Sequence, residues 1–382
     1  MLCALRLRAA LFSLAVAVSA CGGGGPALSR EAALGQSIFA DASLSANGAL
    51  SCASCHDPAH GHAPDNDLAV QLGGVDGHQS GVRATPSIRY LAFAGPFRFD
   101  DEGTARGGFF RDGRAQTLAD QARAPLLNPR EMANASVEEV VARLARAPYA
   151  RRFAAVFGRD IFEHPQLAFD KLALALERYQ VEDPEFRPFD SKFDAVQAGR
   201  ARFTPTEARG FEIFNDPARG NCAACHSSAP ATDGTPALFT DFSYDNLGVP
   251  RNAAIPVNAD PQHFDLGLCD RAELRQSAEL CGAFKVPTLR NVATRRVFFH
   301  NGAIRSLEDA LRFYVTRDTA PERWYPEAGA RKFDDLPLAY RNNVNLSEAP
   351  YDRGIGDVPA LADANLTDLA AFLRALTDGW RP

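Results

Sequence analysis

Two copies of one five-residue pattern constrain this chain more than any other feature: CASCH at 52–56 and CAACH at 222–226. The pattern C-x-x-C-H is typical of c-type haem attachment, in which both thiols form thioether bonds with the porphyrin and the adjacent histidine binds the iron. Zinc ribbons and thioredoxin-like sites also contain C-x-x-C pairs, but neither needs a histidine after the second cysteine in both copies. We therefore predict two covalently bound haem c groups. The residues predicted to hold them are Cys52, Cys55, His56, Cys222, Cys225 and His226.

Two other cysteines are candidates for a disulfide. The chain has 8 cysteines. Four lie in the pentads, and Cys3 and Cys21 belong to the export signal described below, which leaves Cys269 and Cys281. A bond between these two would close a short loop and stabilise the fold by roughly 3 kcal/mol on the chain-entropy estimate. Two free thiols are the alternative, and an oxidising compartment favours the bond.

Residues 1–20 are typical of a signal peptide. MLCALRLR carries two arginines, and the apolar run that follows it is too short to span a bilayer. The run ends in VSAC at 18–21, which resembles a bacterial lipobox, where the cysteine becomes the lipidated first residue of the mature protein. Residues 21–28 then read as a flexible tether. Signal cleavage without a lipid is the alternative. We expect a periplasmic protein whose only membrane contact is a lipid anchor at Cys21.

The charge pattern argues against nucleic acid as a partner. The formal net charge is −6, with acids and bases interspersed rather than in blocks. Phosphate contacts need clustered lysine and arginine instead. Hydrophobic residues make up 46% of the chain and include 26 phenylalanines, which is enough for sizeable cores.

The chain divides into two similar halves, 29–181 and 200–382, joined by a linker at 182–199. Each half opens with a helix that leads into its pentad. Ser29 is the predicted N-cap of the first opening helix, and Thr204 or Thr206 caps the second.

Each half also closes with an amphipathic helix, at 166–180 and at 363–379, with Gly379 as the C-cap of the second. Few stretches alternate at period two, and long loops rich in Gly, Pro and Asn join the helices. We predict an all-α fold with two cytochrome c-like haem domains and long ordered loops.

A further helix is expected at 307–318, LEDALRFYVTRD. Ser306 is placed to act as its N-cap, with Asp309 three residues on. Tyr314 falls on the apolar stripe of this helix, so the local pattern alone indicates a tyrosine packed in the core.

Three longer segments carry a resemblance to a known family. They are LGQSIFADASLSANGALSCASCHDP at 34–58, RDGRAQTLADQARAPLLNPREM at 111–132 and GAFKVPTLRNVATRRVFFHNGAIRSLEDALRFY at 282–314. In order and spacing the chain resembles the bacterial di-haem cytochrome c peroxidases, with their MauG and MbnH relatives, over nearly the whole mature sequence. The ending at 315–353 further resembles the MbnH group.

The resemblance implies that the first haem is the peroxide site. The family's pocket glutamine falls on Gln121 and its acid–base glutamate on Glu131. This pair suits the chemistry, because a carboxylate can move a proton from the near to the far oxygen of peroxide while an amide orients the bound molecule. Met132 is the only methionine outside the signal, so at most one haem could have a methionine ligand.

The resemblance also gives Tyr314 a different role from core packing. Fourteen residues after the histidine of FHNG, His300, the peroxidases carry a methionine that binds the second iron, whereas MauG and MbnH carry a tyrosine. The same count in this chain ends on Tyr314. Tyr314 is therefore predicted to bind the second iron as phenolate, which favours ferric and higher oxidation states.

These likenesses imply an enzyme that uses hydrogen peroxide to form a high-valent di-haem state and then oxidises a partner protein, with tryptophan as a candidate target. The first alternative is a cytochrome c peroxidase that removes hydrogen peroxide with electrons from a small cytochrome or cupredoxin. The second is a non-enzymatic di-haem electron carrier.

Three departures from the family pattern limit what can be carried over. Phe109, Phe110 and Arg111 stand where relatives have a tryptophan between the haems, and the only tryptophans, Trp324 and Trp380, lie elsewhere.

Relatives bind calcium between the haems through an asparagine side chain and two carbonyls. Here Ala84 replaces that asparagine, while the carbonyls fall near Arg295 and Val297, so the sequence leaves calcium open. His78 is the nearest candidate for a removable ligand of the first haem, and we expect it not to bind iron.

Overall fold

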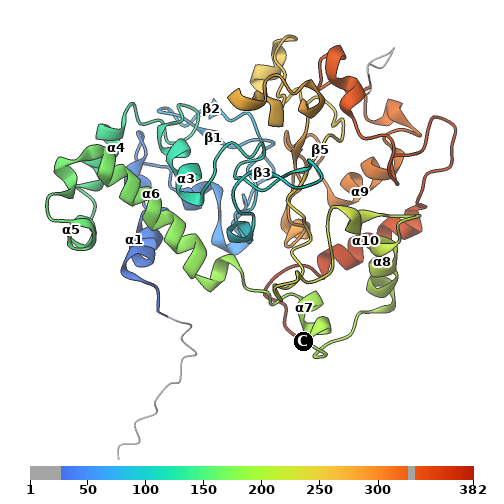
Figure 1. The fold of residues 1–382 in the computed structure, drawn as a ribbon, viewed down its shortest axis with the longest axis horizontal. Coiled ribbons are helices and arrows are strands. Elements are labelled where there is room, and N and C mark those ends of the chain that lie inside the picture. Colours follow the sequence, from blue (N-terminus) through green and yellow to red (C-terminus); the bar gives the residue numbers. More distant parts are fainter. Residues whose placement is uncertain (1–26, 326–331) are drawn as a thin grey trace, which may run out of the picture.

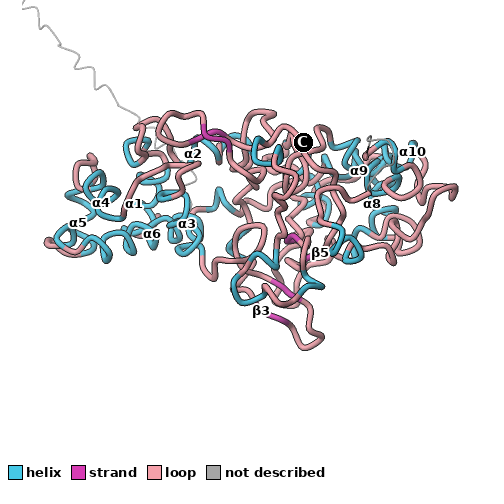
Figure 2. Tube along the Cα trace, turned by 90° about the horizontal axis from the view of Figure 1, so that it is seen from above, coloured by secondary structure: helices cyan, strands magenta, loops and turns pink. Residues whose placement is uncertain are grey.

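The computed structural model describes residues 27–325 and 332–382. The predicted signal peptide, the anchor at Cys21 and most of the tether lie outside these residues. The helices are α1 (Arg30–Phe39), α2 (Cys52–Cys55), α3 (Leu118–Leu127), α4 (Val137–Leu144), α5 (Ala150–Phe157), α6 (Pro165–Glu182), α7 (Lys192–Gln197), α8 (Pro205–Asn215), α9 (Leu307–Thr316) and α10 (Asp363–Arg374). Helices α1 and α3 to α6 gather at one end of the molecule and α8 to α10 at the other, with mostly loops between them (Figure 1, Figure 2).

The fold is mainly helical but not strictly all-α. Its strands are β1 (Leu72–Gly73), β2 (Gln79–Ser80), β3 (Arg98–Phe99), β4 (Ala105–Arg106), β5 (Tyr244–Asp245) and β6 (Phe284–Lys285). They form three antiparallel pairs, β1 with β2, β3 with β4 and β5 with β6. Each strand has only two residues, too few for a period-two pattern to be recognised in the sequence.

The first end of the molecule is built around contact between α1 and α6. Ser29 caps α1, accepting the Ala32 N–H at 3.1 Å, as predicted. A Cβ on Gly35 would lie 2.0 Å from the carbonyl oxygen of Ala175 in α6, so the two helix backbones touch here. The surrounding core includes the buried side chains of Leu34, Ile38, Leu172 and Leu176.

The other end repeats this arrangement with α8 and α10. Thr204, rather than Thr206, is the N-cap of α8. A Cβ on Gly210 would lie 2.1 Å from the carbonyl oxygen of Asp368 in α10. Phe214 and Phe372 are buried beside this contact, with ring centroids 5.2 Å apart. Each opening helix is thus held against its closing helix by a glycine, which positions the loop that carries the pentad.

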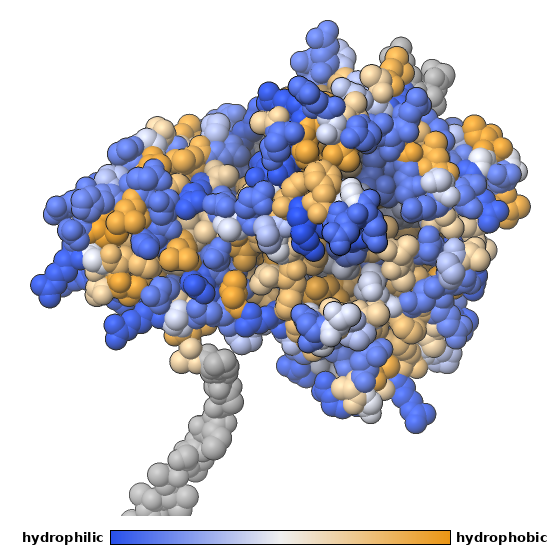
Figure 3. Space-filling view, in the orientation of Figure 1, coloured by the Kyte–Doolittle hydropathy of each residue, from blue (hydrophilic) through white to orange (hydrophobic). Residues whose placement is uncertain are grey.

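One predicted helix end is wrong, and the predicted linker at 182–199 is partly helical. The segment expected as a linker contains α7, whose N-cap Ser191 forms a capping box with Asp194. Helix α10 ends at Arg374 with Ala375 as its C-cap. Gly379 has the positive φ expected of a helix-terminating glycine, +79°, but it lies beyond the end of the helix. Among residues 27–325 and 332–382, no helix has the length and apolar character needed to cross a membrane. The face of the molecule seen in Figure 3 mixes hydrophilic and hydrophobic residues.

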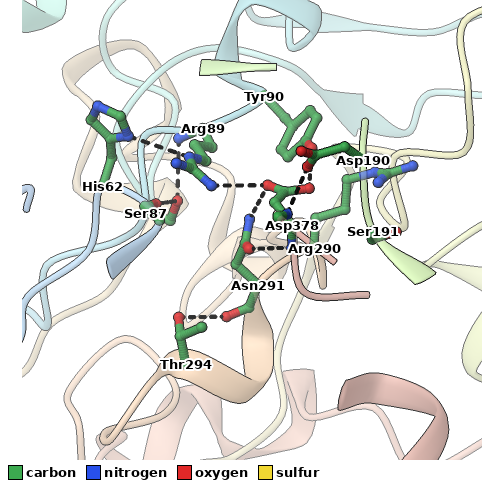
Figure 4. Close-up of polar contacts among 12 residues, drawn as sticks. His62, Ser87, Arg89, Tyr90, Asp190, Ser191, Arg290, Asn291, Thr294 and Asp378 are labelled. Carbon is green, nitrogen blue, oxygen red and sulfur yellow. Dashed lines mark hydrogen bonds and ion pairs between the residues drawn. The ribbon is translucent and has the colours of Figure 1, made fainter. Parts of the chain in front are cut away.

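A buried polar network joins the first half of the chain to the last residues of the second (Figure 4). The Asp378 carboxylate accepts hydrogen bonds from Tyr90 Oη at 2.6 Å, Arg89 Nη1 at 3.1 Å and Asn291 Nδ2 at 2.6 Å. Next to it, the buried Arg290 guanidinium is paired with a carboxylate of α7. These contacts join the segment at 89–90 to Asn291 and to Asp378 near the end of the chain.

Candidate haem sites

The second pentad is arranged as a metal-binding histidine requires. A 3-10 turn, Cys222–Ala224, presents the cysteines, and His226 follows it. The His226 Nδ1–H donates to the carbonyl oxygen of Phe239 at 2.9 Å, because a carbonyl can only accept. This fixes the tautomer that leaves Nε2 with its lone pair free for iron.

The first pentad repeats this geometry on α2. The His56 Nδ1–H donates to the carbonyl oxygen of His62 at 3.2 Å, again leaving Nε2 free. Burial lowers the pKa of His56 to about 4, so the imidazole is neutral at pH 7. All four pentad cysteines are half-buried and none forms a disulfide, so the four sulfur atoms can make the thioether bonds of haem c. The donor set at both pentads therefore fits haem c.

A cavity of about 270 Å³ adjoins the second pentad. This is close to the roughly 300 Å³ at which small-ligand pockets begin. Its wall includes the pentad residues Cys222, Cys225 and His226, and also Tyr314 from α9, a part of the chain distant in sequence. Leu311, Val315, Leu369 and Leu373 make much of the wall apolar, as a porphyrin face requires.

Tyr314 is half-buried and sits in an aromatic cluster on this wall. Its ring lies 5.8 Å from Tyr351 at an interplanar angle of 29°, and 5.8 Å from Phe299. Ser306 caps α9 by accepting the Asp309 N–H at 3.0 Å, as predicted. Burial raises the pKa of Tyr314, with the Asp245 carboxylate adding to the effect. A phenolate at this position therefore needs a nearby positive charge, such as a bound ferric iron.

Glu131 lies beside the first pentad. It is close enough to Cys55 and Cys52 to raise the pKa of both thiols. Its Oε1 accepts from Asn128 Nδ2 at 3.0 Å, which leaves Oε2 without a hydrogen bond from that amide. Glu131 is exposed to solvent, yet desolvation of its carboxyl by the surrounding chain raises its pKa, while the positive charge of Arg114 lowers it. Gln121 is half-buried on α3, the helix that precedes the turn carrying Glu131.

The other residues singled out in the sequence lie as follows. His78 is exposed in the turn between β1 and β2. Met132 is buried in the first core. Trp324 donates to Thr316 Oγ1 at 3.0 Å and packs on Phe313. The predicted disulfide between Cys269 and Cys281 is present.

The sequence did not single out a group of half-buried cations between the two pentads. Arg111, Lys285 and Arg295 all line the cavity of the second pentad. Burial lowers their pKa values, to about 9, 7 and 10 respectively. Phe110 also lines the cavity, in the stretch where relatives have a tryptophan, and the Arg114 guanidinium lies 3.6 Å from its ring centroid.

Comparisons with known proteins agree with this geometry. A sequence profile described as di-haem cytochrome c peroxidase matches residues 29–202. The methylamine utilization protein MauG of Paracoccus denitrificans is 40% identical over 364 residues, covering 92% of this chain and 90% of the relative. The cytochrome c peroxidase Ccp of Escherichia coli is 28% identical over 334 residues, which cover 85% of this chain and 60% of the Escherichia coli protein.

The crystal structure of the diheme peroxidase BthA from Burkholderia thailandensis E264 superposes with a TM-score of 0.86 at 42% identity, covering 91% of this chain and 86% of that one. Haem c cofactors and peroxidase chemistry follow from these relationships, which leaves the alternative of a non-enzymatic electron carrier without support. The chain belongs to the di-haem cytochrome c peroxidase family and is a haem-dependent oxidoreductase.

Proposed function

We propose that this chain is a periplasmic, lipid-anchored di-haem peroxidase of the MauG and MbnH type that oxidises a partner protein, with tryptophan as a candidate target. Cys52, Cys55, Cys222 and Cys225 would hold the two haems covalently, with His56 and His226 as iron ligands. The chemistry that the haems would supply is the reduction of hydrogen peroxide and the storage of its oxidising equivalents. In the balanced reaction, peroxide takes up two electrons and two protons and becomes two waters, and the partner protein supplies the two electrons.

The observation that carries this proposal is the wall shared by Tyr314 and the second pentad. A methionine ligand raises the potential of an iron and suits electron transfer, whereas a tyrosine ligand favours the oxidised metal. Among the described residues of this wall none is a methionine, since Met132 lies in the core of the first half. A site of this kind suits oxidation of a demanding substrate better than acceptance of electrons from a small carrier.

Glu131 and Gln121 would handle peroxide at the first haem. Oε1 of Glu131 accepts a hydrogen bond from Asn128, so Oε2 would be the atom that takes a proton from the near oxygen of peroxide and returns it to the far one. Gln121 would orient the bound molecule by hydrogen bonding. General acid–base catalysis of this kind contributes typically about 10²–10⁴-fold to a rate.

The role of Glu131 is tested by stopped-flow mixing of the ferric holoenzyme with hydrogen peroxide. Glu131→Gln should slow the reaction by about 10²–10⁴-fold, because the amide cannot relay a proton. Glu138→Gln is the matched control, since Glu138 is exposed like Glu131 but its side chain contacts Ser136 rather than the first pentad, and it should react as fast as the unmodified protein. Equal rates for both variants would remove Glu131 from the mechanism.

The ligand assignment is tested by EPR and optical spectra of the ferric protein. Tyr314→Phe should abolish the low-spin species of the second haem, because phenylalanine offers no oxygen donor. Tyr351→Phe is the control, since Tyr351 stacks on Tyr314 and lines the same wall, and it should keep that species. If Tyr351→Phe loses the low-spin species while Tyr314→Phe keeps it, the iron ligand is Tyr351 and the assignment to Tyr314 is wrong.

The nature of the reductant is tested by turnover. With hydrogen peroxide and a reduced small cytochrome c or cupredoxin, we expect slow turnover, and we expect the oxidised enzyme to persist when no reductant is present. Fast turnover would support peroxide removal instead, the activity named in cytochrome c peroxidase relatives such as the Escherichia coli protein. A ferric protein that does not react with peroxide would refute both.

A further inference from the structure

Two half-buried arginines, Arg111 and Arg295, donate hydrogen bonds to main-chain carbonyl groups between the pentads. Arg295 donates from Nη2 to the Thr85 carbonyl oxygen at 2.9 Å and from Nε to the Val297 carbonyl oxygen at 3.3 Å. Arg111 donates from Nε to the Ala84 carbonyl oxygen at 2.9 Å. One guanidinium therefore connects the segment at 84–85 with the segment at 295–297, which lie more than 200 residues apart in the chain.

These segments are where the family resemblance would put a calcium ion. Calcium needs six to eight oxygen ligands. At position 84 a buried alanine offers no side-chain oxygen. The Val297 carbonyl, one of the expected ligands, already accepts from Arg295. The positive charges of Arg111 and Arg295 would also repel a divalent cation, so the residues here do not fit calcium.

We propose that Arg111 and Arg295 replace the calcium ion, so that two fixed guanidinium groups supply the positive charge and the carbonyl ligation between the haem sites. Arginine suits this role because its planar head carries five donors and stays charged even when buried. A side chain also needs no free ion, so the connection does not depend on the calcium concentration outside the cell.

Both guanidinium groups face the second haem site, and Arg295 also lies near the first. Arg111 and Arg295 line the cavity of the second pentad. Arg295 is also close enough to His56 to lower the pKa of that histidine. Its Nη1 is buried without a hydrogen-bond partner, and in the described parts of the chain neither arginine forms an ion pair with a carboxylate. Haem propionates are carboxylates, and Arg–carboxylate pairing would satisfy these donors. Arg83, by contrast, is already paired with Asp112 and Asp265.

The first test is elemental analysis of the unmodified holoenzyme, purified in buffer that contains calcium and then dialysed. We expect far less than a stoichiometric amount of calcium, and we expect a chelator such as EDTA to leave the Soret spectrum and both haem reduction potentials unchanged. Stoichiometric calcium, removed by EDTA with a spectral change, would overturn the proposal. Neither measurement uses peroxide, so the outcome is independent of the proposed catalytic function.

The second test measures haem reduction potentials in variants of Arg295. A buried positive charge favours the reduced iron, so Arg295→Met should lower the potential of both haems, whereas Arg295→Lys, which keeps the charge, should stay closer to the unmodified protein. Arg296→Met is the matched control, because the adjacent Arg296 side chain is 57% exposed and should have no effect. If Arg295→Met and Arg296→Met both leave the potentials unchanged, Arg295 does not supply the charge.

Discussion

Replacement of Asp378 tests whether the two halves of the chain are held together by the buried network of Figure 4. Its side chain is 2% exposed. Two of its donors, Arg89 and Tyr90, come from the first half, and the third, Asn291, borders the cavity of the second pentad. Asp378→Ala would remove the acceptor that all three share and leave the Arg89 charge without its carboxylate.

The size of the effect follows from these contacts. Removing one member of a buried ion pair costs roughly 3–5 kcal/mol, because the other charge is left uncompensated. Arg89 keeps two long contacts, to His62 Nδ1 and to the Pro58 carbonyl oxygen, each 3.4 Å. Burial also raises the pKa of Asp378, which indicates that placing this carboxylate in the interior is itself unfavourable. We therefore expect a loss at the lower end of the range, about 3 kcal/mol in the free energy of unfolding.

The assay is guanidinium chloride unfolding of the holoenzyme followed by two probes. Both tryptophans, Trp324 and Trp380, lie in the second half, so their fluorescence reports that half, while far-UV circular dichroism reports the helices of both. If Asp378 couples the halves, the two transitions should separate in Asp378→Ala, since non-coincident probes indicate loss of two-state behaviour.

A surface aspartate provides the control. Asp160 is 69% exposed and lies 3.7 Å from His164, so Asp160→Ala should change the stability by less than about 0.5 kcal/mol. Asp378→Asn keeps one acceptor oxygen and should lie between the two alanine variants. A loss in Asp378→Ala no larger than in Asp160→Ala, with coincident transitions, would refute the reasoning that this carboxylate joins the halves.

Two further predictions concern pH and the disulfide. Desolvation of its carboxyl raises the pKa of Glu131, so a base that must be ionised is fully active above that raised pKa, and the peroxide reaction should slow as the pH falls through it. Arg114→Ala removes a charge that lowers this pKa, and stopped-flow rates across a pH series should show the fall moved to higher pH; an unmoved profile would contradict the assignment. Replacement of Cys269 and Cys281 together by serine should lower the free energy of unfolding by roughly 3 kcal/mol on the chain-entropy estimate, measured by denaturant unfolding, and a change below about 0.5 kcal/mol would mean that the loop is ordered without the bond.

The features that sequence analysis predicted best are those with local causes. The N-caps Ser29 and Ser306 were recognised because a capping side chain bonds backbone only a few residues away. The pentads were recognised for the same reason, since attachment chemistry is contained in five residues. The C-cap at Gly379 was wrong because a positive φ indicates a turn, not which turn, and α10 ends before it.

The role of Tyr314 is not predicted by the residues next to it in the sequence. Its helix and its cap follow from residues 306–318, and that pattern alone favours a core tyrosine. Only the packing of α9 against the loop of the second pentad places the phenol on the wall of the same cavity as His226. The family resemblance supplied this relationship through a count from His300, and periodicity could not have supplied it.

The cations between the haem sites are the least predictable part of the molecule. The formal charge of −6, with acids and bases interspersed, gives no indication of them. Arg111 and Arg295 donate to main-chain carbonyls rather than to carboxylates, so no pattern of paired charges in the sequence identifies them. Yet the sequence contained a signal in combination: an alanine where relatives supply an oxygen ligand, with arginines at positions 111 and 295 near the same expected site. When a ligand to a metal is lost and cations stand nearby, the charge the metal provided can be carried by the chain itself, and the departures should then be interpreted together rather than one at a time.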